Sequence, residues 1–156
     1  MIELSIPGRG HYQLEYLVLD VNGTIAKDGR LLDKVAKQIA LLRDRLQVHM
    51  ITADTYGKQD NIDLMLGAKS LRLKAGNEAE QKGEYVRGLG AEKVVAIGNG
   101  ANDAEMLKAA AIGIAVVGDE GLAVEALLAA NVVMHSIHEA LNLLEFPTRL
   151  AATLRK

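Results

Sequence analysis

The chain has 156 residues, 49% of them apolar, so it can form one domain with a core of its own but is short for two. It has no cysteine, which excludes disulfides, thiolate metal sites and a cysteine nucleophile. A net charge of -2, a single Phe, four Tyr and no Trp argue against a nucleic-acid partner, because neither a basic surface nor a stacking platform is available.

The N-terminal segment predicts a β-hairpin. Residues 1–6 and 12–19 are strand-like and flank Pro7-Gly8-Arg9-Gly10, a composition typical of a turn. Because apolar strands at a sheet edge invite pairing, this hairpin is also a candidate contact between subunits.

After the hairpin, helices and short apolar strands alternate. Asp33 and Asn77 each stand where they can cap a helix. The other predicted elements are, in chain order, a strand at 48–51, a helix ending near Leu66, a strand at 71–73, a helix ending in Gly88-Leu89-Gly90, a strand at 94–97, a helix at 103–110, a strand at 112–117, a helix at 122–129, a strand at 132–134 and a helical tail from Ile137 interrupted at Pro147. This order predicts an α/β fold, a three-layer Rossmann-like domain over residues 1–156 with a mainly parallel central sheet.

Polar segments follow three of the predicted strands. They are Asp20-Val21-Asn22-Gly23-Thr24, Thr52-Ala53-Asp54 and Gly98-Asn99-Gly100-Ala101-Asn102-Asp103. Open parallel sheets bind ligands beyond the carboxyl ends of their strands, so we expect these segments to meet at one edge. Their carboxylates, hydroxyl, carboxamides and glycines predict a site for phosphate and a cation.

Together with Lys82, these segments resemble the four motifs of the haloacid dehalogenase superfamily. They read LVLDVNGT, ITAD, Lys82 and AIGNGANDAEML, and they follow one another in the family's order. The similarity is greatest to the phosphorylation domain of P-type cation ATPases, whose motifs read Asp-Lys-Thr-Gly-Thr and Gly-Asp-Gly-x-Asn-Asp. It runs from about Tyr16 to the C-terminus, without the nucleotide-binding insertion and membrane helices of those ATPases.

The resemblance implies an aspartyl-phosphate mechanism with Mg²⁺. Asp20, at the end of the first strand of the predicted sheet, would be the carboxylate that attacks phosphorus. The protein ligands of Mg²⁺ would be Asp20, the backbone carbonyl of Asn22, Asn99 and Asp103.

The resemblance also assigns the residues that hold the phosphate. Gly23 and Ala53 would approach it closely with their backbones, and the hydroxyl of Thr52 would hold it. Lys82 would offset the negative charge shared by the phosphate and Asp20.

Two residues depart from the family's phosphatases, each an asparagine in place of an aspartate. Asn22 cannot transfer a proton, and general acid–base help is typically worth about 10²–10⁴ in rate, so turnover should be slow. Asn99 removes a negative charge from the metal site, so Mg²⁺ should bind more weakly. Thr52, Lys82 and Asp103 remain, and a working site is still expected.

Each assigned residue also has an interpretation that needs no catalysis. Asp20 could cap a turn, and Thr52 could simply end a strand. Lys82 competes with Lys74 and could be an exposed helix residue, and GNGAND could be a glycine turn with an asparagine helix cap.

Four further residues are expected to be structural. Asp54 is expected to cap a helix or to support the site, and His49 to be a hydrogen-bonded core residue. His135 and His138 are three residues apart, but no third ligand for a transition metal is evident.

The sequence therefore predicts a slow Mg²⁺-dependent phosphohydrolase acting on a phosphorylated substrate. The alternative is a non-catalytic or regulatory module that binds phosphate or a partner at the same edge. The segments 24–52 and 52–82 have room for only a helix and a strand each, so no cap domain is expected, and either a homo-oligomer or a macromolecular substrate should cover the site. With no signal-peptide pattern and no apolar run of roughly 20 residues, a cytoplasmic protein without a membrane partner is expected.

Overall fold

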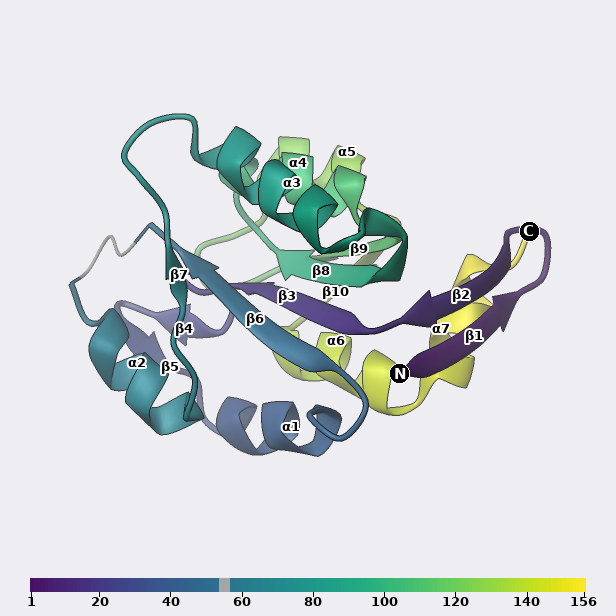
Figure 1. Ribbon diagram of the computed structural model, residues 1–156, viewed down its shortest axis with the longest axis horizontal. Coiled ribbons are helices and arrows are strands. Elements are labelled where there is room, and N and C mark those ends of the chain that lie inside the picture. The colour runs from purple at the N-terminus through teal and green to yellow at the C-terminus, as the bar shows by residue number, and fades with distance from the viewer. Residues whose placement is uncertain (54–56) are drawn as a thin grey trace.

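A six-stranded parallel sheet forms the centre of the molecule (Figure 1), seen in a computed structural model that describes residues 1–53 and 57–156. The strand order is β10-β9-β8-β3-β6-β7, and every neighbouring pair is parallel. The strands are β3 (Tyr16–Asp20), β6 (Gln47–Thr52), β7 (Leu71–Arg72), β8 (Val94–Gly98), β9 (Ile112–Val116) and β10 (Val132–Met134). This confirms the predicted α/β fold with a parallel sheet.

Helices cover both faces of the sheet (Figure 1). The helices are α1 (Val35–Leu42), α2 (Gln59–Leu66), α3 (Glu78–Leu89), α4 (Ala104–Ala109), α5 (Val124–Ala129), α6 (Ile137–Glu145) and α7 (Pro147–Leu154), with short 3-10 turns η1 (Ala91–Lys93) and η2 (Ala101–Asp103). Helices α3, α4 and α5 lie together on one face, and α1 and α6 lie together on the other. Within the described ranges, no helix is long and apolar enough to cross a membrane.

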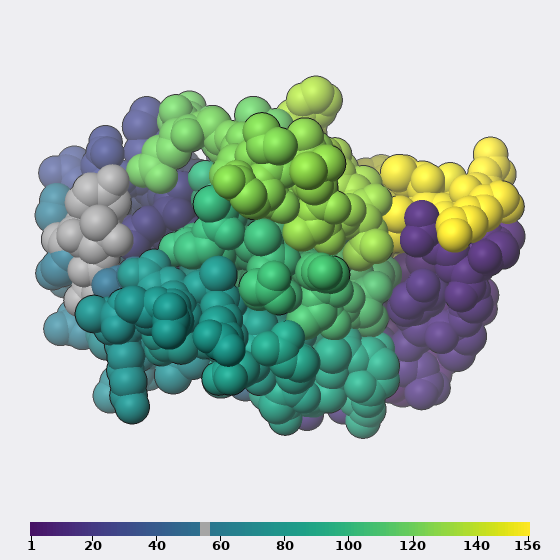
Figure 2. All heavy atoms as spheres, turned by 90° about the horizontal axis from the view of Figure 1, so that it is seen from above, coloured from purple at the N-terminus to yellow at the C-terminus, as the bar shows by residue number. Residues whose placement is uncertain are grey.

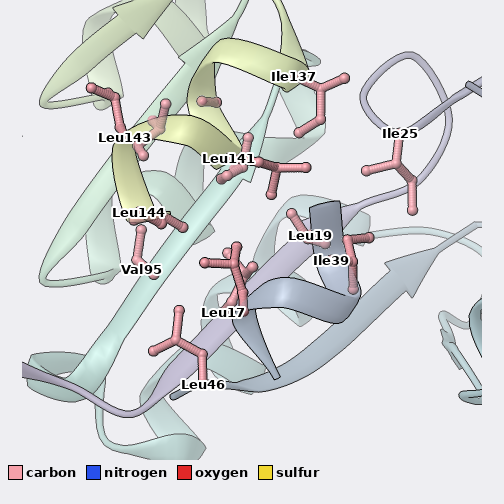
Figure 3. Packing of buried hydrophobic residues seen from close by; sticks show 14 of the residues in the cluster. Leu17, Leu19, Ile25, Ile39, Leu46, Val95, Ile137, Leu141, Leu143 and Leu144 are labelled. Carbon is pink, nitrogen blue, oxygen red and sulfur yellow. The ribbon is translucent and has the colours of Figure 1, made fainter. Parts of the chain in front are cut away.

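Side chains along β3 alternate between the two faces of the sheet, so the core is divided into two clusters. Leu17 and Leu19 of β3 point to the α1–α6 side, where Figure 3 shows them beside Ile39 and Leu141. Val18, between them, belongs to the cluster on the α3–α4 side. The side chains of Leu17, Val18 and Leu19 are all fully buried. The sheet is thus held from both faces, which fixes where its strands end.

The predicted N-terminal hairpin exists, but it forms a sheet of its own. Its strands β1 (Ile2–Ile6) and β2 (Gly10–Leu14) pair antiparallel, and the chain then enters β3 of the central sheet after Glu15. The hairpin packs on α7, and its turn holds the C-terminal residues through a 2.6 Å bond from Nε of Arg9 to the carbonyl of Leu154. Figure 2 shows hairpin and C-terminus side by side at one end of the molecule.

A second hairpin was not predicted. Strands β4 (Ala26–Lys27) and β5 (Arg30–Leu31) pair antiparallel between β3 and α1, where the sequence analysis allowed only a helix and a strand. The sequence signal was Asp28-Gly29, since both residues have positive φ, 51° and 74°, as a tight two-residue hairpin turn requires.

Of the two predicted helix caps, Asn77 is confirmed in position and Asp33 is wrong. Asp33 is not the cap, because the turn after Leu32 places Lys34 in front of α1 with a left-handed φ of 67°. Asn77 does precede α3, but with a φ of 51° and no capping hydrogen bond from its side chain. Asparagine tolerates the left-handed conformation, so the backbone of Asn77 can make this turn.

Candidate active site

Asp20 is the last residue of β3 and is almost completely buried at the carboxyl edge of the sheet. Its Oδ1 accepts a 2.6 Å bond from Nζ of Lys82, and its Oδ2 accepts a 3.0 Å bond from Oγ1 of Thr24. Burial, followed by the negative charge of Asp103, raises the pKa of Asp20 from 3.8 to about 7, although Lys82 opposes this. The site therefore holds excess negative charge that a cation would relieve.

Lys82 projects from α3 and bridges two carboxylates. Its side chain is 1% exposed, and Nζ donates to Asp20 at 2.6 Å and to Asp103 at 2.7 Å. Burial alone would lower the pKa of Lys82, but the charges of Asp20 and then Asp103 outweigh it and raise the pKa above the usual value, which keeps the ammonium protonated. Lys82 is thus not an exposed helix residue, whereas Lys74 is exposed.

Asp103 anchors the loop that follows β8. It is fully buried, and its Oδ2 accepts bonds from the backbone N–H groups of Asn99, at 3.0 Å, and Gly100, at 2.8 Å. Gly98 lies against this carboxylate, since a Cβ there would be 2.6 Å from Cγ of Asp103. Glycine is therefore required at the end of β8, and the loop is held in one conformation.

Thr24 links two predicted site residues, and the sequence analysis did not assign it. Its hydroxyl, buried beside Asp20, can donate to Oδ2 of Asp20, at 3.0 Å, or to Oδ1 of Asn99, at 3.2 Å. It is the last residue of the DVNGT motif, which was the available signal. Thr24 ties the segment after β3 to the loop after β8.

The segments after β3 and β6 also meet. Nδ2 of Asn22 donates to Oγ1 of Thr52 at 3.4 Å, and Thr52 is almost completely buried at the end of β6. Gly23 has a φ of 80°, which a side chain would strain. Ala53 lies at the same edge, while Asp54 is outside the described residues.

A cavity of about 540 Å³ opens over this edge, and five of the eight predicted site residues line it: Asp20, Asn22, Ala53, Lys82 and Asn99. Gly23, Thr52 and Asp103 directly adjoin it through the contacts above. The structure thus brings all eight together. Asn102, Glu120 and the segment 121–123 also line the cavity and were not assigned. Glu120 follows β9, whose polar end Gly118-Asp119-Glu120-Gly121 was the missed signal.

The oxygen atoms at this edge fit a hard divalent cation. The donors near Asp20 are carboxylate, carboxamide and backbone oxygens, the kinds that Mg²⁺ binds. The described residues include no group of three or more His, Cys, Asp or Glu that could hold a metal by themselves. Amide and backbone oxygens would have to complete the set, in keeping with Asn99 in place of an acid.

The histidines take no part in this site. Nδ1 of His49 lies 2.7 Å from the hydroxyl of Tyr85, and the ring also contacts Tyr16, so His49 is the hydrogen-bonded residue that was expected. Nδ1 of His138 lies 2.6 Å from Oε1 of Gln38, which makes it a structural contact between α6 and α1.

Comparison with known proteins agrees with the last of the four motifs. The profile of haloacid dehalogenase-like hydrolases matches residues 83–137, from α3 to the start of α6. The match assigns this part of the chain to the haloacid dehalogenase superfamily. The match covers the loop after β8 that carries Asn99 and Asp103, and the turn that carries Glu120.

Three similar proteins of different kinds illustrate the range of this superfamily. An uncharacterized protein of Methanocaldococcus jannaschii is 47% identical over 64 residues, which cover 41% of this chain and 69% of that protein. The 3-deoxy-D-manno-octulosonate 8-phosphate phosphatase of Moraxella catarrhalis, solved with magnesium, phosphate and its sugar, has a TM-score of 0.64 at 17% identity, covering 89% of this chain and 92% of that one. A zinc-transporting PIB-type ATPase has a TM-score of 0.62 at 30% identity, covering 79% of this chain but only 20% of the transporter.

Proposed function

We propose that this haloacid dehalogenase-superfamily protein is a Mg²⁺-dependent phosphatase that works through an aspartyl-phosphate on Asp20. The observation that supports this most is the buried Asp20–Lys82–Asp103 arrangement, in which one ammonium contacts two carboxylates at 2.6 and 2.7 Å. Burying these charges is unfavourable, so their arrangement at a cavity favours a functional role. The phosphatases among the solved relatives have the same fold.

The chemistry assigned to the chain's own residues is a double displacement. An oxygen of Asp20 attacks the phosphorus, the bond from phosphorus to the leaving oxygen breaks, and the leaving oxygen takes a proton from water. Water then attacks the aspartyl-phosphate, which releases inorganic phosphate and restores Asp20. Lys82 and the hydroxyl of Thr52 hold the negative phosphate oxygens beside the carboxylate throughout.

Asp20, the backbone carbonyl of Asn22 and Asn99 would hold the Mg²⁺, whereas Asp103 does not line the cavity and would act through Lys82 and the loop that it anchors. When bound, Mg²⁺ supplies positive charge that lets an anionic nucleophile approach an anionic phosphate. The charges support this, because two buried carboxylates, Asp20 and Asp103, share the single ammonium of Lys82. The magnesium in the sugar-phosphate phosphatase gives the same cation in a related fold.

Asn22 makes the second displacement the slow step. Its amide donates to Thr52 at 3.4 Å and cannot accept a proton as a carboxylate can, so the attacking water receives no general base from this position. A slow second step favours a phosphoenzyme that accumulates. The same observation favours the second candidate, a regulatory module that binds phosphate or a partner and turns over little.

Turnover distinguishes the two candidates. The protein is incubated with a generic aryl phosphate and Mg²⁺, and phosphate release is compared with that of Asp20→Asn. The proposal expects slow release that requires Mg²⁺ and is lost in the variant. Release that is absent from the wild type, together with phosphate binding at this edge, would assign the protein to the regulatory class instead.

The substrate is proposed to be a phosphorylated molecule. Either this molecule itself or a second subunit would cover the open site. Among the described residues, the segments between the site strands β3, β6 and β8 hold only the β4–β5 hairpin, α1, α2, β7, α3, η1 and short loops. Water must be excluded from an open cavity for its charges to act strongly. We also propose a cytoplasmic location for this activity.

A further inference from the structure

The loop after β8 carries one carboxylate fewer than the P-type ATPase motif it resembles. Asn99 stands where that motif has an aspartate, so the site that should hold a divalent cation is short of one negative charge. Glu120, a residue of the cavity that the motifs do not include, lies at this place.

Glu120 belongs to a tight turn after β9 whose two acids point to different places. The turn is closed by Gly118 and Gly121, which exchange backbone bonds of 3.3 and 2.9 Å. Asp119, in the middle of the turn, accepts a 2.7 Å bond from Nζ of Lys27 in the β4–β5 hairpin. Glu120, next to it, lines the site cavity together with Asp20.

The carboxylate of Glu120 reaches the backbone of the segment after β3. A Cβ on Gly23 would lie 2.5 Å from Oε2 of Glu120 and 2.8 Å from Nδ2 of Asn99. The two side chains therefore meet over Gly23, in space that only glycine leaves open. Gly23 directly follows Asn22, whose carbonyl is assigned to the cation.

Asn99 itself holds the turn that presents Glu120. Its Nδ2 donates to the carbonyl of Gly121 at 3.4 Å, and its own carbonyl accepts a 2.9 Å bond from the N–H of Ala123. An aspartate has no N–H to donate at this position. Asn99, which leaves the loop without the aspartate's charge, thus also anchors the turn that carries the charge of Glu120.

We propose that Glu120 replaces the missing acid of position 99, so that the turn after β9 supplies a carboxylate that acts on the divalent cation through a bound water. The inference rests on the proposed function, because it concerns the same cation site. Removing a group that supports a metal in this way typically lowers its affinity by about 10-fold to 100-fold.

Isothermal titration calorimetry with Mg²⁺ at fixed ionic strength tests the proposal without any turnover. Glu120→Gln is expected to bind Mg²⁺ at least about 10-fold more weakly than the wild type. Asp119→Asn is the matched control: it removes the same charge from the same turn but on the side of Lys27, and it is expected to change the affinity by less than about twofold because exposed charges are screened. Equal affinity in wild type and Glu120→Gln, or equal losses in both variants, would overturn the proposal.

A second substitution tests whether positions 99 and 120 contribute to the same cation site. Asn99→Asp is expected to restore most of the Mg²⁺ affinity when combined with Glu120→Gln, and to add much less to the wild type. Equal effects in both backgrounds would show that the two side chains act independently, which contradicts replacement. If the wild type binds Mg²⁺ and only this coupling fails, the proposed function stands without Glu120; if the wild type binds no Mg²⁺ and releases no phosphate, the proposed function itself fails.

Discussion

At the scale of single residues, replacing Lys82 is expected to have the largest effect on the free energy of unfolding. Lys82 is the one cation in contact with both Asp20 and Asp103 among the described residues, and it is almost completely buried. Lys82→Met would leave two carboxylates facing each other without a counter-charge, and the expected loss is about 3–5 kcal/mol in the free energy of unfolding. Urea denaturation measures it.

The control for this substitution is Lys74→Met, at the exposed lysine that competed for the same role. Exposed substitutions usually change the free energy of unfolding by less than about 0.5 kcal/mol. Similar stabilities for the two variants would contradict the buried ion network.

The raised pKa of Asp20 predicts a pH-dependent stability. With a pKa of 3.8 unfolded and about 7 folded, the carboxyl group favours the folded state below pH 4 and loses this contribution as the pH rises to 7. Asp20→Asn cannot lose it, so the melting temperature of the variant minus that of the wild type should grow between pH 4 and 7 in EDTA. A difference that does not change with pH would refute the shift, and Mg²⁺ should reduce the difference near pH 8.

At the scale of elements, close approach between a helix and a strand is a specific requirement. A Cβ on Gly113 of β9 would collide with the backbone carbonyl of Leu107 in α4. Gly113→Ala is expected to destabilise the protein by about 1–3 kcal/mol, since both partners are backbone and cannot turn away. Gly88→Ala, in α3 with open space around it, should be neutral or stabilising by up to about 1 kcal/mol. Urea denaturation compares them, and equal effects would contradict this packing.

Most elements of the sheet could be predicted from the sequence, because short apolar runs such as Val94–Gly98 are bounded by polar or glycine-rich segments. The site edge followed from the same runs, since parallel strands deliver Asp20, Thr52 and Asn99 to one side. The predictions failed where the backbone conformation, and not the residue type, determines the local structure. Lys34 takes a left-handed conformation that its residue type does not announce.

Glu120 was missed for a different physical reason. It reaches the site from β9, which pairs with β8 and not with β3, and its approach depends on a turn held by Asn99. A pattern of residues within one segment cannot show such a contact between segments. The pairing of Thr24 with Asn99 was hidden in the same way, although both residues lie in the motifs.

At the scale of the whole molecule, apolar surface beside the cavity predicts association. Cavity residues Leu122 and Ala123 lead into α5, where Val124 is 63% and Leu128 is 79% exposed. A second subunit or a large substrate would bury this surface and cover the open site. The N-terminal hairpin, which packs on α7 at the other end of β3, stays the other predicted contact.

Light scattering behind a sizing column tests this expectation. We expect a dimer or tetramer that Leu128→Lys weakens, or a monomer that acts poorly on small phosphate esters. Leu71→Lys, at another exposed leucine, is the control. A monomer that rapidly hydrolyses small phosphorylated metabolites would contradict both branches.

The most direct test of the central claim is intact-mass spectrometry after incubation with a reactive phosphate donor and Mg²⁺. We predict one added phosphoryl group on the wild type, mapped to Asp20 and absent from Asp20→Asn. Asn22→Asp should accelerate its loss by up to about 10²-fold, because the new carboxylate can activate water. A wild type that never carries phosphate, with no change in Asn22→Asp, would contradict the aspartyl-phosphate mechanism.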